Sequence, residues 1–205
     1  MKRPLIIIFL VLVIDQLVKL YVKSHFVLGE EYKIAPWFII HFTENNGMAY
    51  GMQFSGQYGK IFLSVFRIAA VAGIGWYLIR LVKEHANPGL IASIALIFAG
   101  ALGNIIDSAF YGLIFSDSSY EVAKLFPQGG GYAGFLHGKV VDMLYFPIME
   151  GYFPTWFPIW GSEEYIFFRP VFNCSDSAIT IGVLMILVFQ RRFYPRKPEE
   201  QQVVS

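Results

Sequence analysis

Cysteine and charge are both scarce in this chain, and each shortage excludes a class of protein. Among 205 residues there is one cysteine, Cys174, which excludes an internal disulfide framework and any multi-cysteine metal site. Only 15% of the residues are charged, against about 25% in typical soluble domains. With a hydrophobic share of 56%, this also excludes a disordered chain, which needs low hydrophobicity and high charge.

An excess of basic residues is missing as well. The 16 Lys and Arg residues are nearly balanced by 15 Asp and Glu residues, so the formal net charge is +1. A nucleic-acid-binding domain normally carries a basic patch or stripe. We therefore expect no nucleic-acid partner.

Long apolar runs are what the chain does contain, at about 5–21, 61–82, 90–113 and 172–189. A bilayer core about 30 Å thick needs roughly 20 residues of helix, and all four runs fit that length. Buried helices of a soluble all-α protein are the alternative, but little amphipathic helix remains to cover them. The sequence therefore predicts an all-α membrane protein with four transmembrane helices, built as a single membrane-embedded domain over 1–205.

Basic residues mark one end of these runs and so predict the orientation. Lys and Arg stay on the cytoplasmic side, and the residues that carry this signal are Lys2, Arg3, Arg80, Lys83, Arg191, Arg192, Arg196 and Lys197. Both termini and the short 83–89 loop are therefore expected inside, and the connections at about 24–59 and 114–171 outside. The first run is expected to be retained, because Asp15, Gln16 and Lys19 occur where a signal peptide would have a small-x-small cleavage site.

The two outer connections have different compositions. Residues 37–42 are strand-like and predict a small sheet on the membrane surface, so the helical protein should carry a small β-containing extracytoplasmic platform. The stretch 145–170 is rich in aromatic residues and interrupted by prolines. Because Tyr and Trp favour the headgroup interface, we expect this aromatic loop to lie on the outer leaflet.

Several ionisable residues lie inside or beside the apolar runs, where each costs roughly 2.5–3.5 kcal/mol on insertion scales. Asp15 and Lys19 are one helical turn apart and can neutralise each other, although such a pair could also only orient its helix. Asn104 and Asp107 share a face of the third run, and Arg67 lies inside the second. These groups require an explanation beyond membrane insertion.

Three aspartates converge near the outer face on the predicted topology: Asp107, Asp142 and Asp176. Asp142 lies among apolar neighbours, while Asp176 opens the fourth run, where it could also be a helix cap. Two carboxylates about 4 Å apart repel by about 4 kcal/mol at an effective dielectric of about 20, which is about three pKa units. Such a pair holds one proton near neutral pH, so one member can activate water while the other polarises a carbonyl, as in aspartic proteases.

Five short motifs follow one another along the chain: D-Q-L-V-K at 15–19, N-N-G-M-A-Y at 45–50, G-A-L-G-N-I-I-D at 100–107, V-V-D at 140–142 and F-N-C-S-D-S at 172–177. Each alone is a weak signal, but together, in this order and on the predicted spans, they are specific. On these residues the chain resembles the lipoprotein signal peptidases, also called signal peptidase II.

The resemblance implies an intramembrane aspartic endopeptidase whose catalytic residues are Asp142 and Asp176. Its supporting or substrate-binding positions would be Asp15, Lys19, Asn45, Gly47, Asn104, Asp107 and Asn173. The implied substrate is a prolipoprotein carrying diacylglyceryl on a cysteine, cut just before that cysteine near the outer face of the bacterial inner membrane. Neither a metal nor a cofactor is implied. Membrane lipids are the expected surroundings, and we expect a monomer.

Three departures from the family pattern accompany the match, one of them being the loops, since 34 residues separate Asp107 from Asp142 and the aromatic insertion before Asn173 is longer than usual. Ser108 follows Asp107 where the family usually has Arg, and Ser175 replaces the usual Ala beside Asp176. We predict that Arg67 pairs with Asp107 in place of the missing arginine, because a bidentate pair would satisfy both groups in the membrane. The alternative is that Arg67 snorkels to the headgroups.

Two other functions are compatible with parts of the pattern. One is a small four-helix transporter or proton pathway, in which Asp15, Lys19, Arg67 and Asp107 line a relay. The other is a divalent-cation site made from Asp142, Asp176 and His137, although no ligand spacing supports it. The first predicts ionisable groups spread through the membrane depth, whereas the acids other than Asp15 cluster at one face.

Overall fold

The computed structural model describes residues 2–46, 56–147, 149–152, 154–156, 158, 164–167 and 170–194. One of the predicted site residues, Gly47, lies outside this part of the chain, as does much of the aromatic stretch that follows residue 147.

Four long helices form the body of the protein: α1 (Lys2–His25), α2 (Gly56–Lys83), α3 (Pro88–Ile106) and α5 (Cys174–Phe193). All four are long and apolar enough to cross a membrane, with α3 counted together with its continuation to Ile114. The predicted spans are therefore confirmed as helices. Helices α1 and α2 extend beyond their predicted runs at both ends, whereas α3 ends before the end of its run and α5 begins two residues inside its run.

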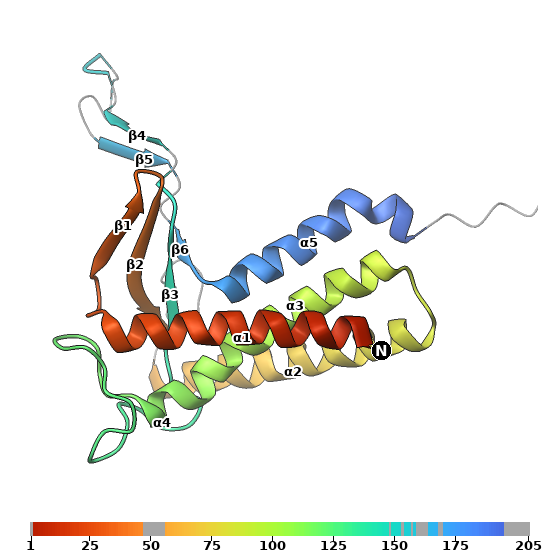
Figure 1. Ribbon diagram of the computed structural model, residues 1–205, viewed down its shortest axis with the longest axis horizontal. Coiled ribbons are helices and arrows are strands. Elements are labelled where there is room, and N and C mark those ends of the chain that lie inside the picture. Colours follow the sequence, from red (N-terminus) through yellow and green to blue (C-terminus); the bar gives the residue numbers. More distant parts are fainter. Residues whose placement is uncertain are drawn as a thin grey trace, which may run out of the picture.

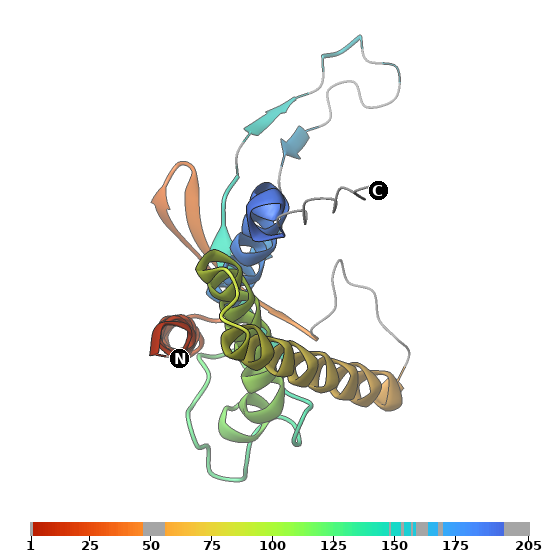
Figure 2. The same cartoon turned by 90° about the vertical axis from the view of Figure 1, so that its right-hand side faces the viewer.

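Helix α3 is the central helix and packs against α1, α2 and α5. Figure 1 shows α1 and α2 running in nearly the same direction with α3 crossing them obliquely, and Figure 2 shows α2 diverging from α5. Glycines allow α5 to approach α3 closely, because a Cβ on Gly100 would lie only 2.2 Å from the Ser175 carbonyl oxygen. A Cβ on Gly182 would likewise lie 2.6 Å from the carbonyl oxygen of Ser93. Small residues at such contacts are how membrane helices pack backbone to backbone.

The third span does not end as a regular helix. A five-residue π-helix, η2 (Asp107–Tyr111), follows α3 and leads into a short helix α4 (Gly112–Ile114). Single π-turns inside α-helices are rare and frequently mark functional sites. This one begins at Asp107, one of the predicted site residues, and the apolar pattern gave no sign of it.

A four-stranded antiparallel sheet lies at one end of the helices (Figure 1), with strand order β1-β2-β3-β6. Its strands are β1 (Glu31–Ala35), β2 (Phe38–Asn45), β3 (Val140–Tyr145) and β6 (Val171–Phe172). The predicted strand at 37–42 is confirmed as the first part of β2. A separate hairpin, β4 (Met149–Tyr152) with β5 (Glu164–Phe167), occupies part of the aromatic stretch.

The sheet is attached to the helices by an apolar cluster. Phe42 from β2 and Met143 from β3 are both fully buried, and they pack with Tyr111 and Phe115 beyond the end of α3. Along β3, Asp142 lies between the buried residues Val141 and Met143 and is paired in register with Thr43 of β2. A carboxylate is thus built into the strand that joins the sheet to the helices.

Candidate active site

Asp142 is buried on β3, with 3% of its surface exposed. Its carboxylate accepts a hydrogen bond from the Asn173 amide nitrogen at 2.7 Å and another from the Asn45 amide nitrogen. Burial raises the pKa of Asp142 to about 7, and the nearby charge of Asp176 adds to that shift, while the two asparagine bonds act in the opposite direction. The carboxyl group can therefore carry a proton near neutral pH.

Asp176 lies in the first turn of α5. Asn173 is the N-cap of this helix, and its side-chain oxygen accepts from the Asp176 backbone nitrogen at 2.9 Å. The Asp176 carboxylate in turn accepts from the Asn173 backbone nitrogen at 3.3 Å, which completes a capping box. The alternative that Asp176 is itself the cap is therefore wrong: Asn173 caps the helix, and Asp176 is the third helical residue.

Asn173 and Asn104 connect the two carboxylates. The Asn173 amide nitrogen contacts Asp142 and also lies 3.1 Å from the side-chain oxygen of Asn104. The Asn104 amide nitrogen donates to Asp176 at 2.8 Å. Asn173 is fully buried, and the side-chain amides of Asn173 and Asn104 bond to each other as well as to the carboxylates of Asp142 and Asp176. These bonds fix the two carboxylates relative to each other.

Lys19 of α1 contacts Asn104, the residue that holds Asp176. Its ammonium lies 2.9 Å from Asp15, 2.8 Å from Asp107 and 2.9 Å from the side-chain oxygen of Asn104. All three charged side chains are fully buried. The predicted Asp15–Lys19 contact is therefore present. The Asp15 carboxylate has a further partner, because the backbone nitrogen of Ser175 donates to it at 2.8 Å.

The prediction that Arg67 pairs with Asp107 is wrong. Asp107 is neutralised by Lys19, and it also accepts from Gln16 at 2.9 Å and from the Val141 backbone nitrogen at 3.3 Å. The carboxylates whose charges act on Arg67 are those of Asp176 and Asp142. Similar depth in the membrane suggested Arg67 as the partner, whereas Lys19 reaches Asp107 from the neighbouring helix α1.

Gln16 lies among these residues, a contact that was not predicted from the sequence. Its amide nitrogen donates to Asp15 at 3.1 Å and to Asp107 at 2.9 Å, and its oxygen accepts from the Tyr111 hydroxyl at 3.2 Å. The available signal was its presence in the D-Q-L-V-K motif. A polar amide within an apolar helix needs buried partners, so it could have been included.

A second buried charge pair lies beside the site. Lys23, one helical turn beyond Lys19, forms an ion pair with Glu44, and both side chains are almost completely buried. The ammonium lies 5.0–5.9 Å from the ring centroids of Phe42, Phe115 and Tyr132. Cation–π contacts and the ion pair together anchor β2 immediately before Asn45.

The two alternative functions can be compared with this geometry. Within the described residues there is no group of three His, Cys, Asp or Glu side chains that could hold a metal ion. His137, the proposed third ligand, contacts the Phe135 carbonyl oxygen through Nδ1 at 2.8 Å. Asp15, Lys19 and Asp107 form one closed cluster and are not spread across the membrane depth, which argues against a proton pathway.

A buried carboxylate, Asp142, and a half-buried one, Asp176, both bonded to one asparagine at the end of four membrane-capable helices, are the arrangement expected of an acid–base hydrolase embedded in a membrane. The model of the family described as "Signal peptidase (SPase) II" matches residues 7–191 of this chain. The chain therefore belongs to the signal peptidase II family of aspartic proteases, as the resemblance predicted.

Named relatives extend the match over most of the chain. A lipoprotein signal peptidase of Porphyromonas gingivalis is 50% identical over 191 residues, which cover 93% of this chain and 81% of that protein. The lipoprotein signal peptidase of Amoebophilus asiaticus is 38% identical, with 89% and 75% covered. A solved bacterial membrane enzyme, determined by the in meso method at 2.3 Å resolution, has a TM-score of 0.60 at 23% identity, covering 97% of this chain and 96% of that one. That likeness supports the fold.

Proposed function

We propose that Asp142 and Asp176 are the catalytic pair with which this signal peptidase cuts prolipoproteins, just before a cysteine that carries diacylglyceryl. The observation that carries the assignment is that both carboxylates accept a hydrogen bond from Asn173, Asp142 from its side-chain amide and Asp176 from its backbone nitrogen, which holds two acids of interacting charge together. The names of the relatives supply the substrate class.

The reaction follows from a pair that shares one proton. The ionised carboxylate removes a proton from a water molecule, whose oxygen attacks the scissile carbonyl carbon, while the protonated carboxyl group donates to the carbonyl oxygen. When the tetrahedral intermediate collapses, the carbon–nitrogen bond breaks and the leaving amine takes up a proton from the pair. Asn45 and Asn173 keep Asp142 in place during both steps.

The remaining predicted site residues are proposed to position this pair. Asn104 holds Asp176, Lys19 holds Asn104, and Asp15 and Asp107 neutralise Lys19. Gly47 is proposed as a substrate-binding position on the strength of its motif.

The proposed location is the bacterial inner membrane, with both termini inside and the catalytic pair near the outer face. Lys2, Lys83 and Arg191 lie at the helix ends remote from the sheet, which supports this orientation by the positive-inside rule. Membrane lipids would cover exposed apolar side chains such as Phe9 and Phe62, at 64% and 66% exposure. We further propose a monomer, a single domain, and contact of the aromatic stretch around Trp156 with the outer leaflet.

The test is cleavage of a lipidated prolipoprotein by the purified protein in detergent, beside the same substrate without lipid. Asp142→Asn and Asp176→Asn should each abolish cleavage, and the double variant should be no worse, because residues that act as a unit are not additive. Asp117→Asn, at an exposed carboxylate, is the matched control and should retain full activity. Appreciable cleavage by either single variant, or equal cleavage of the unlipidated substrate, would overturn the proposal.

A further inference from the structure

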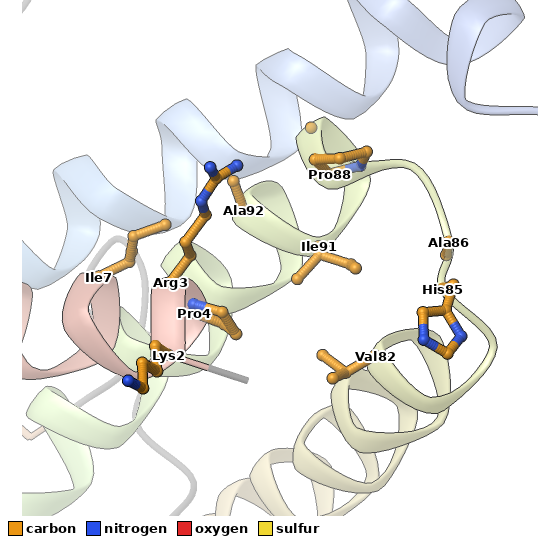
Figure 3. A pocket seen from close by; sticks show the side chains of 11 residues that line it. Lys2, Arg3, Pro4, Ile7, Val82, His85, Ala86, Pro88, Ile91 and Ala92 are labelled. Atoms are coloured by element: carbon orange, nitrogen blue, oxygen red, sulfur yellow. The ribbon is translucent and has the colours of Figure 1, made fainter.

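A cavity of about 830 Å³ lies at the opposite end of the helices from the two aspartates. Figure 3 shows its walls: the first turns of α1, the end of α2 with the loop that follows it, and the first turns of α3. Its volume is within the range of about 300–1,000 Å³ of typical ligand pockets. No step of the proposed reaction uses it.

The cavity has an apolar part and a basic part. Ile7, Val82 and Ile91 come from three different helices and provide apolar walls, whereas Lys2 and Arg3 lie on one side and His85 on another. None of the eleven lining residues, all of which belong to the described part of the chain, is acidic. The cavity therefore suits a molecule that is anionic at one end and apolar along the rest.

The basic side chains are not already neutralised. Within the described ranges, neither Lys2 nor Arg3 forms an ion pair, while the neighbouring acid Glu84 is engaged by Arg80 at 2.7 Å. The start of α3 does not provide the anion affinity either, because the Gly89 backbone nitrogen is capped by the Asn87 side chain at 2.8 Å. Attraction for an anion must come from the side chains of Lys2 and Arg3.

We propose that this cavity binds an anionic phospholipid of the surrounding bilayer. The phosphate group lies at the side of the cavity formed by Lys2 and Arg3, and an acyl chain lies along Ile7, Val82 and Ile91. Basic pockets between transmembrane helices are a recognised form of lipid headgroup site. The apolar walls favour a lipid over free phosphate, because free phosphate would leave them in contact with water.

The test is a titration of the purified protein with phosphatidylglycerol or with the zwitterionic phosphatidylethanolamine, followed by native mass spectrometry. Phosphatidylglycerol should bind saturably with one molecule per chain, at least about fivefold more tightly than phosphatidylethanolamine. The variant Lys2→Gln/Arg3→Gln should weaken phosphatidylglycerol binding by about tenfold or more and remove this preference. Ala92→Phe, which fills the cavity without changing charge, should weaken binding of both lipids.

The matched control is Lys83→Gln/Arg191→Gln, which removes the same charge at the same end of the helices but lies outside the cavity. It should change phosphatidylglycerol affinity by less than twofold. Equal weakening by both double variants would mean diffuse attraction and would overturn the site. So would unchanged binding in Lys2→Gln/Arg3→Gln, or displacement of the lipid by inorganic phosphate at millimolar concentration.

Discussion

The amide nitrogen of Asn173 lies 2.7 Å from a carboxylate oxygen of Asp142, although 31 positions separate the two residues in the sequence. Asn173 has two tasks, because its side-chain oxygen also caps α5 at the Asp176 backbone nitrogen. A substitution that keeps the cap but shortens the side chain can separate these tasks.

Asn173→Ser is expected to lower activity and to cost less stability than Asn173→Ala. Serine is a good N-cap, so α5 should still begin at its present residue, whereas alanine at a cap costs about 0.5–2 kcal/mol. The serine hydroxyl cannot reach Asp142, so that carboxylate loses its amide donor. We expect kcat to fall by at least about tenfold, KM to change less, and the melting temperature in detergent to fall less than with Asn173→Ala, because both variants lose the amide bonds but only serine keeps the cap. A fall in melting temperature equal to that of Asn173→Ala would show that the hydroxyl does not cap the helix.

The activity should decrease as the pH rises above about 7. Asp142 has a pKa of about 7 and the proposed reaction needs one proton on the pair, so deprotonation of Asp142 removes the active form. The hydrogen bond from Asn45 lowers this pKa. Asn45→Ala should therefore move the alkaline limb of the kcat profile to higher pH, and a limb that stays in place would contradict the assignment.

Asp142 should also make stability depend on pH. Its folded pKa of about 7 exceeds the ordinary value of 3.8, so its contribution to stability is fully present below about 3.8 and is lost as pH rises through about 7. About three pKa units correspond to roughly 4 kcal/mol as an upper-end figure. Unfolding in detergent should show Asp142→Asn gaining stability over the parent protein at pH 8 and gaining little at pH 4. A difference between the two proteins that does not vary with pH would be inconsistent with a raised pKa.

Lys19→Met should be more damaging than its double variant with Asp107→Asn. The single change leaves two buried carboxylates, those of Asp15 and Asp107, without their cation. Breaking a buried pair from one side costs about 3–5 kcal/mol, and neutralising Asp107 removes part of that cost. Thermal unfolding of Lys19→Met, Asp107→Asn and the double variant, each compared with the parent protein, measures the coupling. Lys33→Met, on the exposed strand β1, is the control. Additive losses would show that Lys19 and Asp107 are independent.

Gly100→Ala should strongly destabilise the protein, whereas Gly73→Ala should not. A Cβ at Gly100 would lie 2.2 Å from the backbone oxygen of Ser175 and 2.8 Å from Ile179, so α5 would have to move away from α3. Overpacking of this kind costs about 1–3 kcal/mol or more. Nothing lies within 4 Å of a Cβ at Gly73. Activity should be lost with Gly100→Ala, since Asp176 is carried on α5, and equal effects of the two variants would contradict the packing argument.

The sequence by itself determined the membrane class, the four spans and the family. Apolar runs of sufficient length specify transmembrane helices by the energy of insertion alone. The resemblance carried by the five motifs predicted the residues that gather around Asp142 and Asp176 in the structure, apart from Gly47, which lies outside the described residues. Strand-like residues at 37–42 similarly indicated β2, since the alternation of side chains is a local property.

Only the tertiary structure decided which partners these residues have. The sequence paired Asp107 with Arg67 by depth, but Lys19 of α1 reaches it instead, together with Gln16. The choice of Asn173 over Asp176 as the cap of α5, and the π-turn at Asp107, likewise depended on how α3 and α5 pack. The physical reason is that hydrophobicity acts one segment at a time, whereas a hydrogen bond or ion pair needs two atoms within about 3 Å. That distance is set by helices and strands remote in the sequence.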